Sequence, residues 1–194
     1  MPSMRVKQYH FGIAAAILGI IGMVFTGPTA HAEDDTYTME EVVGAATGFF
    51  GATTEGIATV IEKVFSELGQ PNGYVTGEEV SGAFIVGLRY GRGMLTRKTS
   101  EDQQIYWQGP SIGFDFGGNA SKVFTLIYNL PNDELLFQRF PGVDGSFYYV
   151  AGVGMNYQAA DDVTLAPIRT GVGLRLGANV GYLHYSREHS WIPF

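Results

Sequence analysis

Ser111 is the residue whose surroundings come nearest to a catalytic motif. The stretch GPSIG, residues 109–113, fits the G-x-S-x-G pattern, in which a serine on a sharp strand-to-helix turn attacks a carbonyl carbon. Here a strand-like alternating segment follows Ser111, and the chain shows no alternation of strands and helices that could build such a hydrolase. We therefore predict that Ser111 is not a nucleophile and that residues 107–110 form a tight turn.

A second group of residues has the side chains that commonly bind metal ions: His184, Glu188 and His189. We expect this segment to be a strand, in which His184 and His189 point to opposite faces and cannot share one ion. The phosphate-binding and dinucleotide-binding glycine motifs are also incomplete. The sequence thus predicts no metal site and no cofactor.

Two pairs of adjacent acids, Glu78-Glu79 and Asp161-Asp162, have the side chains of a general acid and base. Adjacent residues of a strand point to opposite faces, so neither pair can converge on a substrate. We interpret both pairs as solvated loops. No catalytic residue remains, and we expect the protein not to be an enzyme.

One pattern points to a polar cluster. Three segments, GLRYG, GFDFG and GLRLG, place a charged residue between two glycines, each two positions away; the charged residues are Arg89, Asp115 and Arg175. In a strand, each charge shares a face with its glycines. We predict that Asp115 pairs with Arg89 or Arg175. Three interpretations stay open: an ion cluster inside a barrel that fixes strand register, a ligand-facing polar site, or exposure to solvent.

The elements that must position these residues begin with two helices. Thr38 and Glu41 form a capping box for a helix from Met39 to about Phe50. Thr54 can cap a second helix, which Gly69 ends. The apolar residues of this second helix share one face at spacings of three and four; they are Ile57, Ile61, Val64, Phe65 and Leu68.

From Gly73 onward the apolar residues recur with a period of two, which is typical of strands. We expect eight to ten short strands, among them residues 134–137, 147–157, 168–176 and 178–187. The segments 117–119, 131–133, 141–145 and 160–162 have turn composition. The predicted fold is mainly β: a small antiparallel β-barrel or strongly curved meander with two N-terminal helices.

The start of the chain has the features of a leader for export. Arg5 and Lys7 precede an uncharged apolar run over residues 11–25, and Ala30-His31-Ala32 fits a signal-peptidase site. We predict a cleaved signal peptide over residues 1–32, a mobile lead-in over 33–37 and one domain over 38–194, located in the periplasm. The alternative is an uncleaved anchor, although the apolar run is shorter than the roughly 20 residues that span a membrane.

The composition of the chain excludes some kinds of chemistry and disfavours some partners. The chain has no cysteine, which excludes disulfides and thiol chemistry. Without the leader its net charge is −9, which disfavours nucleic acid as a partner and purely electrostatic binding to anionic lipid. The terminal Phe194 would suit an outer-membrane barrel, but Pro193 and the polar segment 186–190 do not suit a final membrane-spanning strand.

Three longer stretches carry a resemblance to a known family. They are YWQGPSIGFD (106–115), KVFTLIYNL (122–130) and PIRTGVGLRLGANVGY (167–182). With them, the chain resembles the envelope integrity protein A family of alphaproteobacteria over nearly all of residues 38–194. This resemblance implies a periplasmic β-barrel protein with a role in envelope integrity and implies no catalytic residue. A fainter similarity links the glycine-rich strands to SYLF-type lipid-binding domains.

We therefore expect a non-enzymatic periplasmic protein that binds an envelope component. A protein partner, a lipid and a polysaccharide precursor stay open as that component, and so does contact with a membrane surface. The alternative is a structural barrel associated with the outer membrane, and an enzyme acting on envelope polymers comes third.

Overall fold

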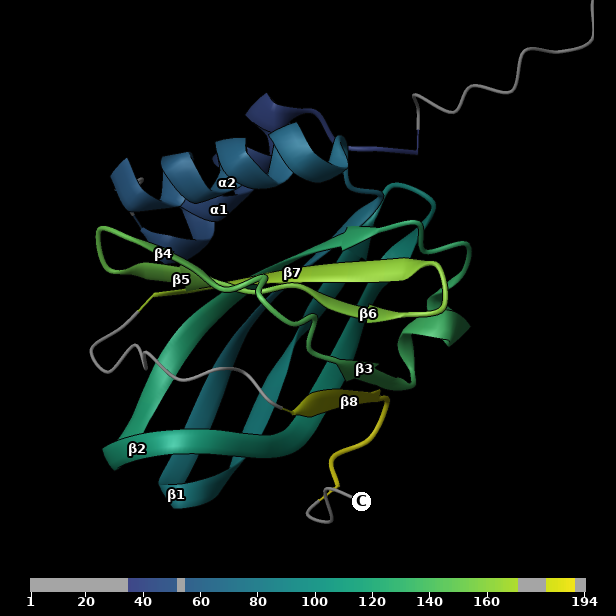
Figure 1. Ribbon diagram of the computed structural model, residues 1–194. Helices are drawn as coiled ribbons and strands as arrows, with labels where there is room; N and C mark the ends of the chain where they lie inside the picture. Colours follow the sequence, from purple (N-terminus) through teal and green to yellow (C-terminus); the bar gives the residue numbers. More distant parts are fainter. Residues whose placement is uncertain (1–34, 52–54, 171–180, 191–194) are drawn as a thin grey trace, which may run out of the picture. The chain divides into compact units, whose positions relative to one another are not determined.

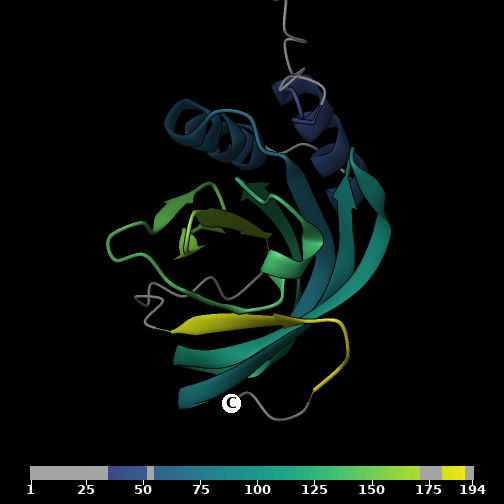
Figure 2. The same cartoon turned by 90° about the vertical axis from the view of Figure 1, so that its right-hand side faces the viewer.

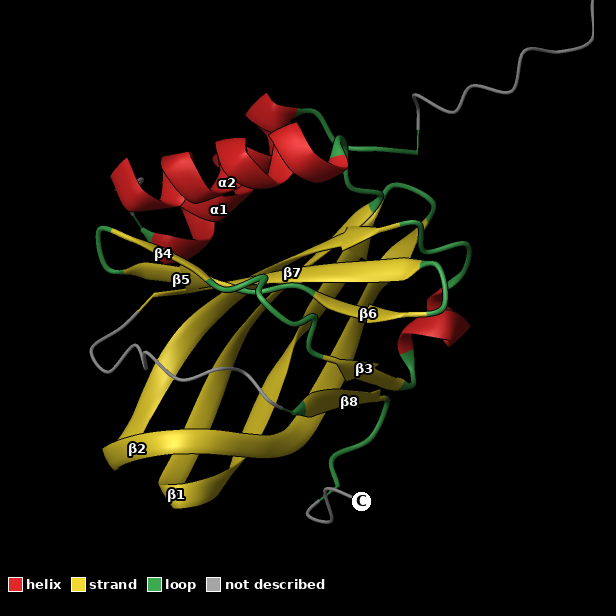
Figure 3. Ribbon diagram, viewed as in Figure 1, coloured by secondary structure: helices red, strands yellow, loops and turns green. Residues whose placement is uncertain are grey.

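Two helices lie over a strongly curved antiparallel sheet (Figure 1). The computed structural model describes residues 35–51, 55–170 and 181–190, without the side chains of residues 81–87 and 111–119. These residues belong to one unit, which begins at His31. The predicted signal peptide, residues 1–32, lies outside the described residues. The predicted fold class, mainly β with two N-terminal helices, is confirmed (Figure 3).

Both helices begin and end where local sequence signals place them. Helix α1 (Met39–Phe50) starts with the predicted capping box, in which Thr38 and Glu41 each accept a hydrogen bond from the other's backbone N–H. Gly51 ends it in a left-handed conformation, with φ of 86°. Helix α2 (Glu55–Leu68) buries the predicted apolar face and ends at Gly69, whose N–H donates to Phe65 O.

Two very long strands form the main hairpin of the sheet. Strand β1 (Gly73–Arg97) pairs with β2 (Ser100–Tyr128), from Gly73 opposite Ile127 to Arg97 opposite Ser100. The pairing shifts between Ser81 and Ala83, where the two strands use unequal numbers of residues. Such a bulge bends the strand and increases its twist. Figure 2 shows β1 and β2 curling under the helices.

The remaining elements are short. They are the 3-10 helix η1 (Asp133–Leu136) and the strands β3 (Arg139–Pro141), β4 (Tyr148–Val150), β5 (Val153–Met155), β6 (Gln158–Ala160), β7 (Val163–Thr170) and β8 (Tyr182–Ser186). The two ends of β2 have different neighbours: residues 122–128 pair with β7 and residues 106–108 pair with β8. Strand β3 continues the sheet from β8, and a bridge between Gly142 and Gln158 joins that side to β6 and β7. The sheet thereby curls into a barrel-like form.

Alternation along the strands separates two cores. In the last part of β2, Phe124 and Leu126 face the helices and pack with Ile57 and Ile61, whereas Val123 and Ile127 face the inside of the curved sheet. All are buried on their own side. Burial of each such side chain contributes about 1.5–3 kcal/mol, so this strand is anchored from both faces.

Trp107 fills the bend of the main hairpin from the inside. A Cβ atom on Gly91 would lie 1.9 Å from Trp107 Cε2, and one on Gly77 would lie 2.3 Å from Arg92 O and 2.6 Å from the indole. The two arms of β1 therefore approach each other closely across the ring of Trp107. Only residues without a side chain permit this approach.

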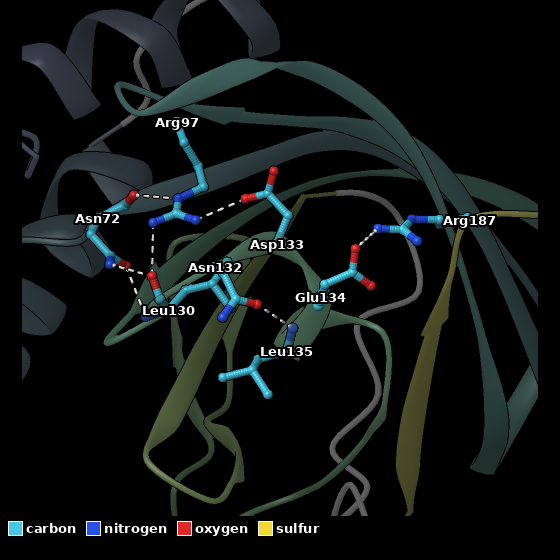
Figure 4. Close-up of polar contacts among 8 residues, drawn as sticks. All are labelled: Asn72, Arg97, Leu130, Asn132, Asp133, Glu134, Leu135 and Arg187. Carbon is cyan, nitrogen blue, oxygen red and sulfur yellow. Dashed lines mark hydrogen bonds and ion pairs between the residues drawn. The ribbon is translucent and has the colours of Figure 1, made fainter.

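Arg97 ties together one end of the curved sheet (Figure 4). It is 8% exposed, and it donates to Asp133 Oδ1 at 2.8 Å, Leu130 O at 2.7 Å and Asn72 O at 3.4 Å. Asn72 also bonds Leu130 through both its amide nitrogen and its oxygen. One buried guanidinium thus joins the start of β1, the end of β1 and the segment after β2.

Four local predictions about strands and turns are wrong. The segments 107–110 and 117–119 are not turns but parts of β2, because residues 107–110 pair regularly with β1 and residues 117–118 lie in the bulge. Residues 134–137 are mainly η1 and not a strand, because the Asn132 side chain caps that turn by accepting from Leu135 N–H. Residues 147–157 form a hairpin and not one strand, since Ala151 and Gly152 both have positive φ.

Candidate functional site

A buried ion cluster lies inside the curved sheet, centred on Glu79 of β1. Its carboxylate is 4% exposed, and Oε1 lies 3.2 Å from both Arg89 Nε and Arg169 Nε. The other oxygen, Oε2, accepts a hydrogen bond of 2.9 Å from Trp107 Nε1. One carboxylate thus holds two guanidiniums and the ring that fills the bend.

The second arginine has a further polar partner. Arg169 Nη1 donates to Asn156 Oδ1 at 3.0 Å, and Asn156 is itself 2% exposed. Arg169 Nη2 is buried and has no hydrogen-bond partner among the residues that the structure describes. The arginine side chains are 11% and 12% exposed, although Arg89 Nε and Arg169 Nη2 are themselves buried.

Strand alternation explains why these residues meet. Glu79 has the same parity in β1 as the buried Val75 and the close-packed Gly77, and Arg169 has the same parity in β7 as the buried Leu165. All of them face the inside of the sheet, whereas Glu78 points outward and is exposed.

The electrostatics of the cluster keep Glu79 ionised. Burial, the largest influence, raises the pKa of this carboxyl group, but the attraction of Arg169 and Arg89 and the hydrogen bond from Trp107 together lower it more. The pKa of Glu79 therefore lies below its ordinary value. Burial also raises the pKa of the neighbouring Tyr185, which stays a neutral phenol hydrogen-bonded to Thr125.

The predicted cluster of Arg89, Asp115 and Arg175 is described only in part. Arg89 pairs with Glu79. Asp115 lies in β2 opposite Ala83, but its side chain is outside the described set, and Arg175 is outside the described residues altogether. The predicted pairing of Asp115 with Arg89 or Arg175 stays a prediction.

Glu79 is the residue that sequence reasoning placed wrongly. The interpretation of Glu78-Glu79 as a solvated loop holds for the exposed Glu78 and is wrong for Glu79, which is buried in a strand and paired. The sequence offered one indication of its burial: in a strand, Glu79 shares a face with Val75 and Gly77. Arg169 lay within a predicted strand, but nothing in its local sequence distinguished it.

The other candidate residues do not form a site in the described part of the chain. His184 lies in β8 and His189 follows that strand, with its ring against Tyr106. The described residues include no group of three or more side chains that could hold a metal ion. The backbone at Ser111 is a strand within β2, not the strand-to-helix turn of a hydrolase.

No helix in the described ranges has the length and apolarity needed to cross a membrane.

Fold and site together define a class of protein: a small barrel-like antiparallel sheet covered by two helices, with a charged cluster inside. A crystal structure described as a beta-barrel-like, uncharacterized protein from Brucella abortus is similar to this chain. It shares 52% sequence identity, covers 82% of this chain and 99% of its own, and superposes with a TM-score of 0.74. A comparison with curated proteins gives no match.

The family model of envelope integrity protein A matches residues 35–194. The chain belongs to the envelope integrity protein A family, and the resemblance noted from the sequence is confirmed. The family name gives the protein a role in envelope integrity and a location in the cell envelope.

Proposed function

We propose that this protein is a non-enzymatic periplasmic protein that supports envelope integrity by binding an envelope component inside its curved sheet. The observation that carries the proposal is the interior cluster, in which Glu79, Arg89 and Arg169 lie largely buried together inside the sheet. Three charges inside a sheet are costly, and apolar residues of similar size are often at least as stabilising. A binding role accounts for their presence better than stability does.

The state of Glu79 supports binding over catalysis. Both of its oxygens are engaged, Oε1 by the two arginines and Oε2 by Trp107, and its pKa is lowered. A general acid needs a proton to give at neutral pH, and a general base needs a free lone pair near the substrate. Glu79 is ionised and 4% exposed, and its oxygens already contact three groups, so its role is to hold the arginines in place.

The periplasmic location rests on the leader-like residues 1–32 and the envelope family. Osmotic shock of cells that produce the full chain tests it. We expect release of a protein that begins at Glu33, identified by N-terminal sequencing, without detergent. Retention in the cytosol, or an intact leader on the released protein, contradicts the proposal.

Binding is tested with the protein purified from the periplasm. Native mass spectrometry should show a species heavier than the polypeptide, and dissociation should release a bound molecule. Glu79→Gln should reduce the bound fraction because the arginines lose the group that orients them, whereas the exposed neighbour variant Glu78→Gln should retain it. A mass equal to the bare polypeptide in every preparation contradicts binding of a tightly held component.

A second candidate function is an outer-membrane-associated structural barrel. Three apolar residues on the outer face of β1 favour it: Val80, Leu88 and Met94 are 49%, 38% and 39% exposed. The same fractionation separates the two functions. Release by osmotic shock supports the periplasmic binding protein, and a requirement for detergent supports the membrane-associated barrel.

A further inference from the structure

We infer that the edge strand β4 pairs with β4 of a second copy of this chain, so that two sheets join into one. The inference is independent of the proposed binding function. It follows from three features of residues 147–150: an unpaired backbone edge, exposed aromatic side chains, and a register in which the segment is complementary to itself.

Strand β4 is the last strand at one end of the sheet (Figure 1). It pairs with β5 on one side, and a two-residue turn of positive φ makes Val150 and Val153 the closing pair of the hairpin. Hydrogen-bonded and non-hydrogen-bonded pairs alternate along such a ladder, so the N–H and C=O of Tyr149 and of Phe147 point away from β5. Among the described residues, neither has a backbone partner on that side.

The side chains of this edge are aromatic and uncharged. Tyr148 and Val150 pack toward the helices, whereas Phe147 and Tyr149 lie on the other face and are 37% and 46% exposed. Edge strands that stay single are commonly protected by a lysine, a proline or a bulge, and β4 contains none of these. Such an edge is a template for pairing with another strand.

Helix α2 holds the edge in place. The ring of Tyr148 lies under Lys63, whose Nζ is 4.9 Å from the ring centroid. A Cβ atom on Gly56 would lie 2.8 Å from Val150 O, so the helix approaches the hairpin closely. The edge is therefore formed before a partner arrives, which lowers the entropic cost of pairing.

A second copy is favoured as the partner because the segment is complementary to itself. When two antiparallel copies are centred on Tyr148, Phe147 of each copy lies opposite Tyr149 of the other. All the unpaired backbone groups of these two residues are then used, and two aromatic cross-strand pairs form. No charged side chains face each other along the paired strands. The axis is two-fold, as in most dimers of identical chains.

The test uses the protein purified from the periplasm and sedimentation velocity from about 1 µM to about 1 mM. The paired edge is short, so the interface lies at the small end of the range for protein complexes. We expect a dimer that forms with rising concentration, with a Kd between about 10 µM and 1 mM.

Variants test the surface and the register. Phe147→Lys should raise the Kd at least about tenfold, because a lysine protects an edge from pairing. Leu135→Lys adds the same charge on η1, at a side chain that is 40% exposed, and should dimerise as the wild type does. Tyr149→Glu should also weaken the dimer, and its combination with Phe147→Lys should restore it because opposite charges then meet across the axis. The melting temperature of each variant checks that it is folded.

The outcomes are distinct. A monomer at about 1 mM overturns the inference, and so does a dimer that Phe147→Lys and Leu135→Lys affect equally or that the double variant does not restore. If the protein stays monomeric but co-purifies with another polypeptide that Phe147→Lys releases, the edge pairs with a different chain and the second copy is wrong. None of these outcomes bears on the proposed binding function, which Glu79→Gln tests.

Discussion

Glu79 and Arg89 belong to the same strand, ten positions apart, and yet Arg89 Nε lies 3.2 Å from Glu79 Oε1. An extended strand covers about 33 Å over that length. The side chains can meet only because β1 bends strongly between them, where the register shifts near Ser81. The ion pair therefore depends on the curvature of the hairpin and in turn connects its two arms.

Removal of the central carboxylate should destabilise the protein strongly. Glu79→Gln removes the carboxylate that two largely buried guanidiniums contact, and we expect a loss of about 3–5 kcal/mol in the free energy of unfolding. Urea denaturation at pH 7 measures it. Glu78→Gln is the matched control, since Glu78 is exposed and should cost less than about 0.5 kcal/mol. Equal losses in the two variants contradict the central role of Glu79.

The same carboxylate should make stability depend on acid pH. In the folded protein the pKa of Glu79 lies below its ordinary value of 4.5, although burial opposes the shift, because two arginines and Trp107 favour the ionised form. Its contribution to stability is complete above pH 4.5 or so and is lost as the pH falls through the folded-state pKa. Between pH 6 and about pH 3, Glu79→Gln should lose less stability than wild type, measured by urea midpoints. If the stability of both proteins falls equally over this pH range, Glu79 is not the group responsible for the acid dependence.

The packing of Trp107 predicts a contrast between two glycines. Gly91→Ala places a Cβ 1.9 Å from Trp107 Cε2, and the indole cannot retreat without losing its hydrogen bond to Glu79. We expect a loss of about 1–3 kcal/mol in the free energy of unfolding. Gly44→Ala in α1 meets nothing within 4 Å and should stabilise the helix by about 0.5–1 kcal/mol. Thermal denaturation distinguishes the two signs, and a stabilising Gly91→Ala contradicts the close approach.

Two arginines near η1 should contribute unequally to stability, because one is buried and the other is exposed (Figure 4). Arg97→Gln removes bonds to Leu130 O and Asp133 from a side chain that is 6% exposed, and we expect a loss of about 2–4 kcal/mol. Arg187 pairs with Glu134 at the surface, where the side chains are 49% and 70% exposed. Arg187→Gln should cost less than about 1 kcal/mol. Denaturant unfolding of both variants measures the difference. Similar losses of stability would contradict the role of the buried Arg97 in joining β1 to the segment after β2.

Local features of the structure follow directly from the sequence. The capping box of Thr38 and Glu41, the end of α2 at Gly69 and the change to a period of two at Gly73 all depend on neighbours within a few positions. Their physical basis is short-range hydrogen bonding and side-chain periodicity. The prediction of a mainly β fold with two N-terminal helices was correct for this reason.

The length of the long strands was not predictable in the same way. Gly109 and the glycines at 117–118 have the composition of turns, yet β2 continues through them. A glycine permits a turn and a bent strand equally, and the choice depends on which other strands pair with the segment. Here β8 and β7 pair with opposite ends of β2 and extend the sheet on both sides of the bend.

The sequence alone determined which face of a strand each residue shares, because side chains alternate with a period of two whatever the rest of the chain does. It placed Arg89 with its glycines, and the same alternation, which our interpretation of Glu79 as a solvated loop overlooked, puts Glu79 on the face of Val75 and Gly77. Only the tertiary structure decided that these faces point inward and that Glu79 meets Arg89 and Arg169, as the distances of 3.2 Å show. The reason is that ion pairing acts over a few ångströms, and the curvature that brings the three strand segments within that range comes from bulges, glycines and pairing distributed over the whole sheet.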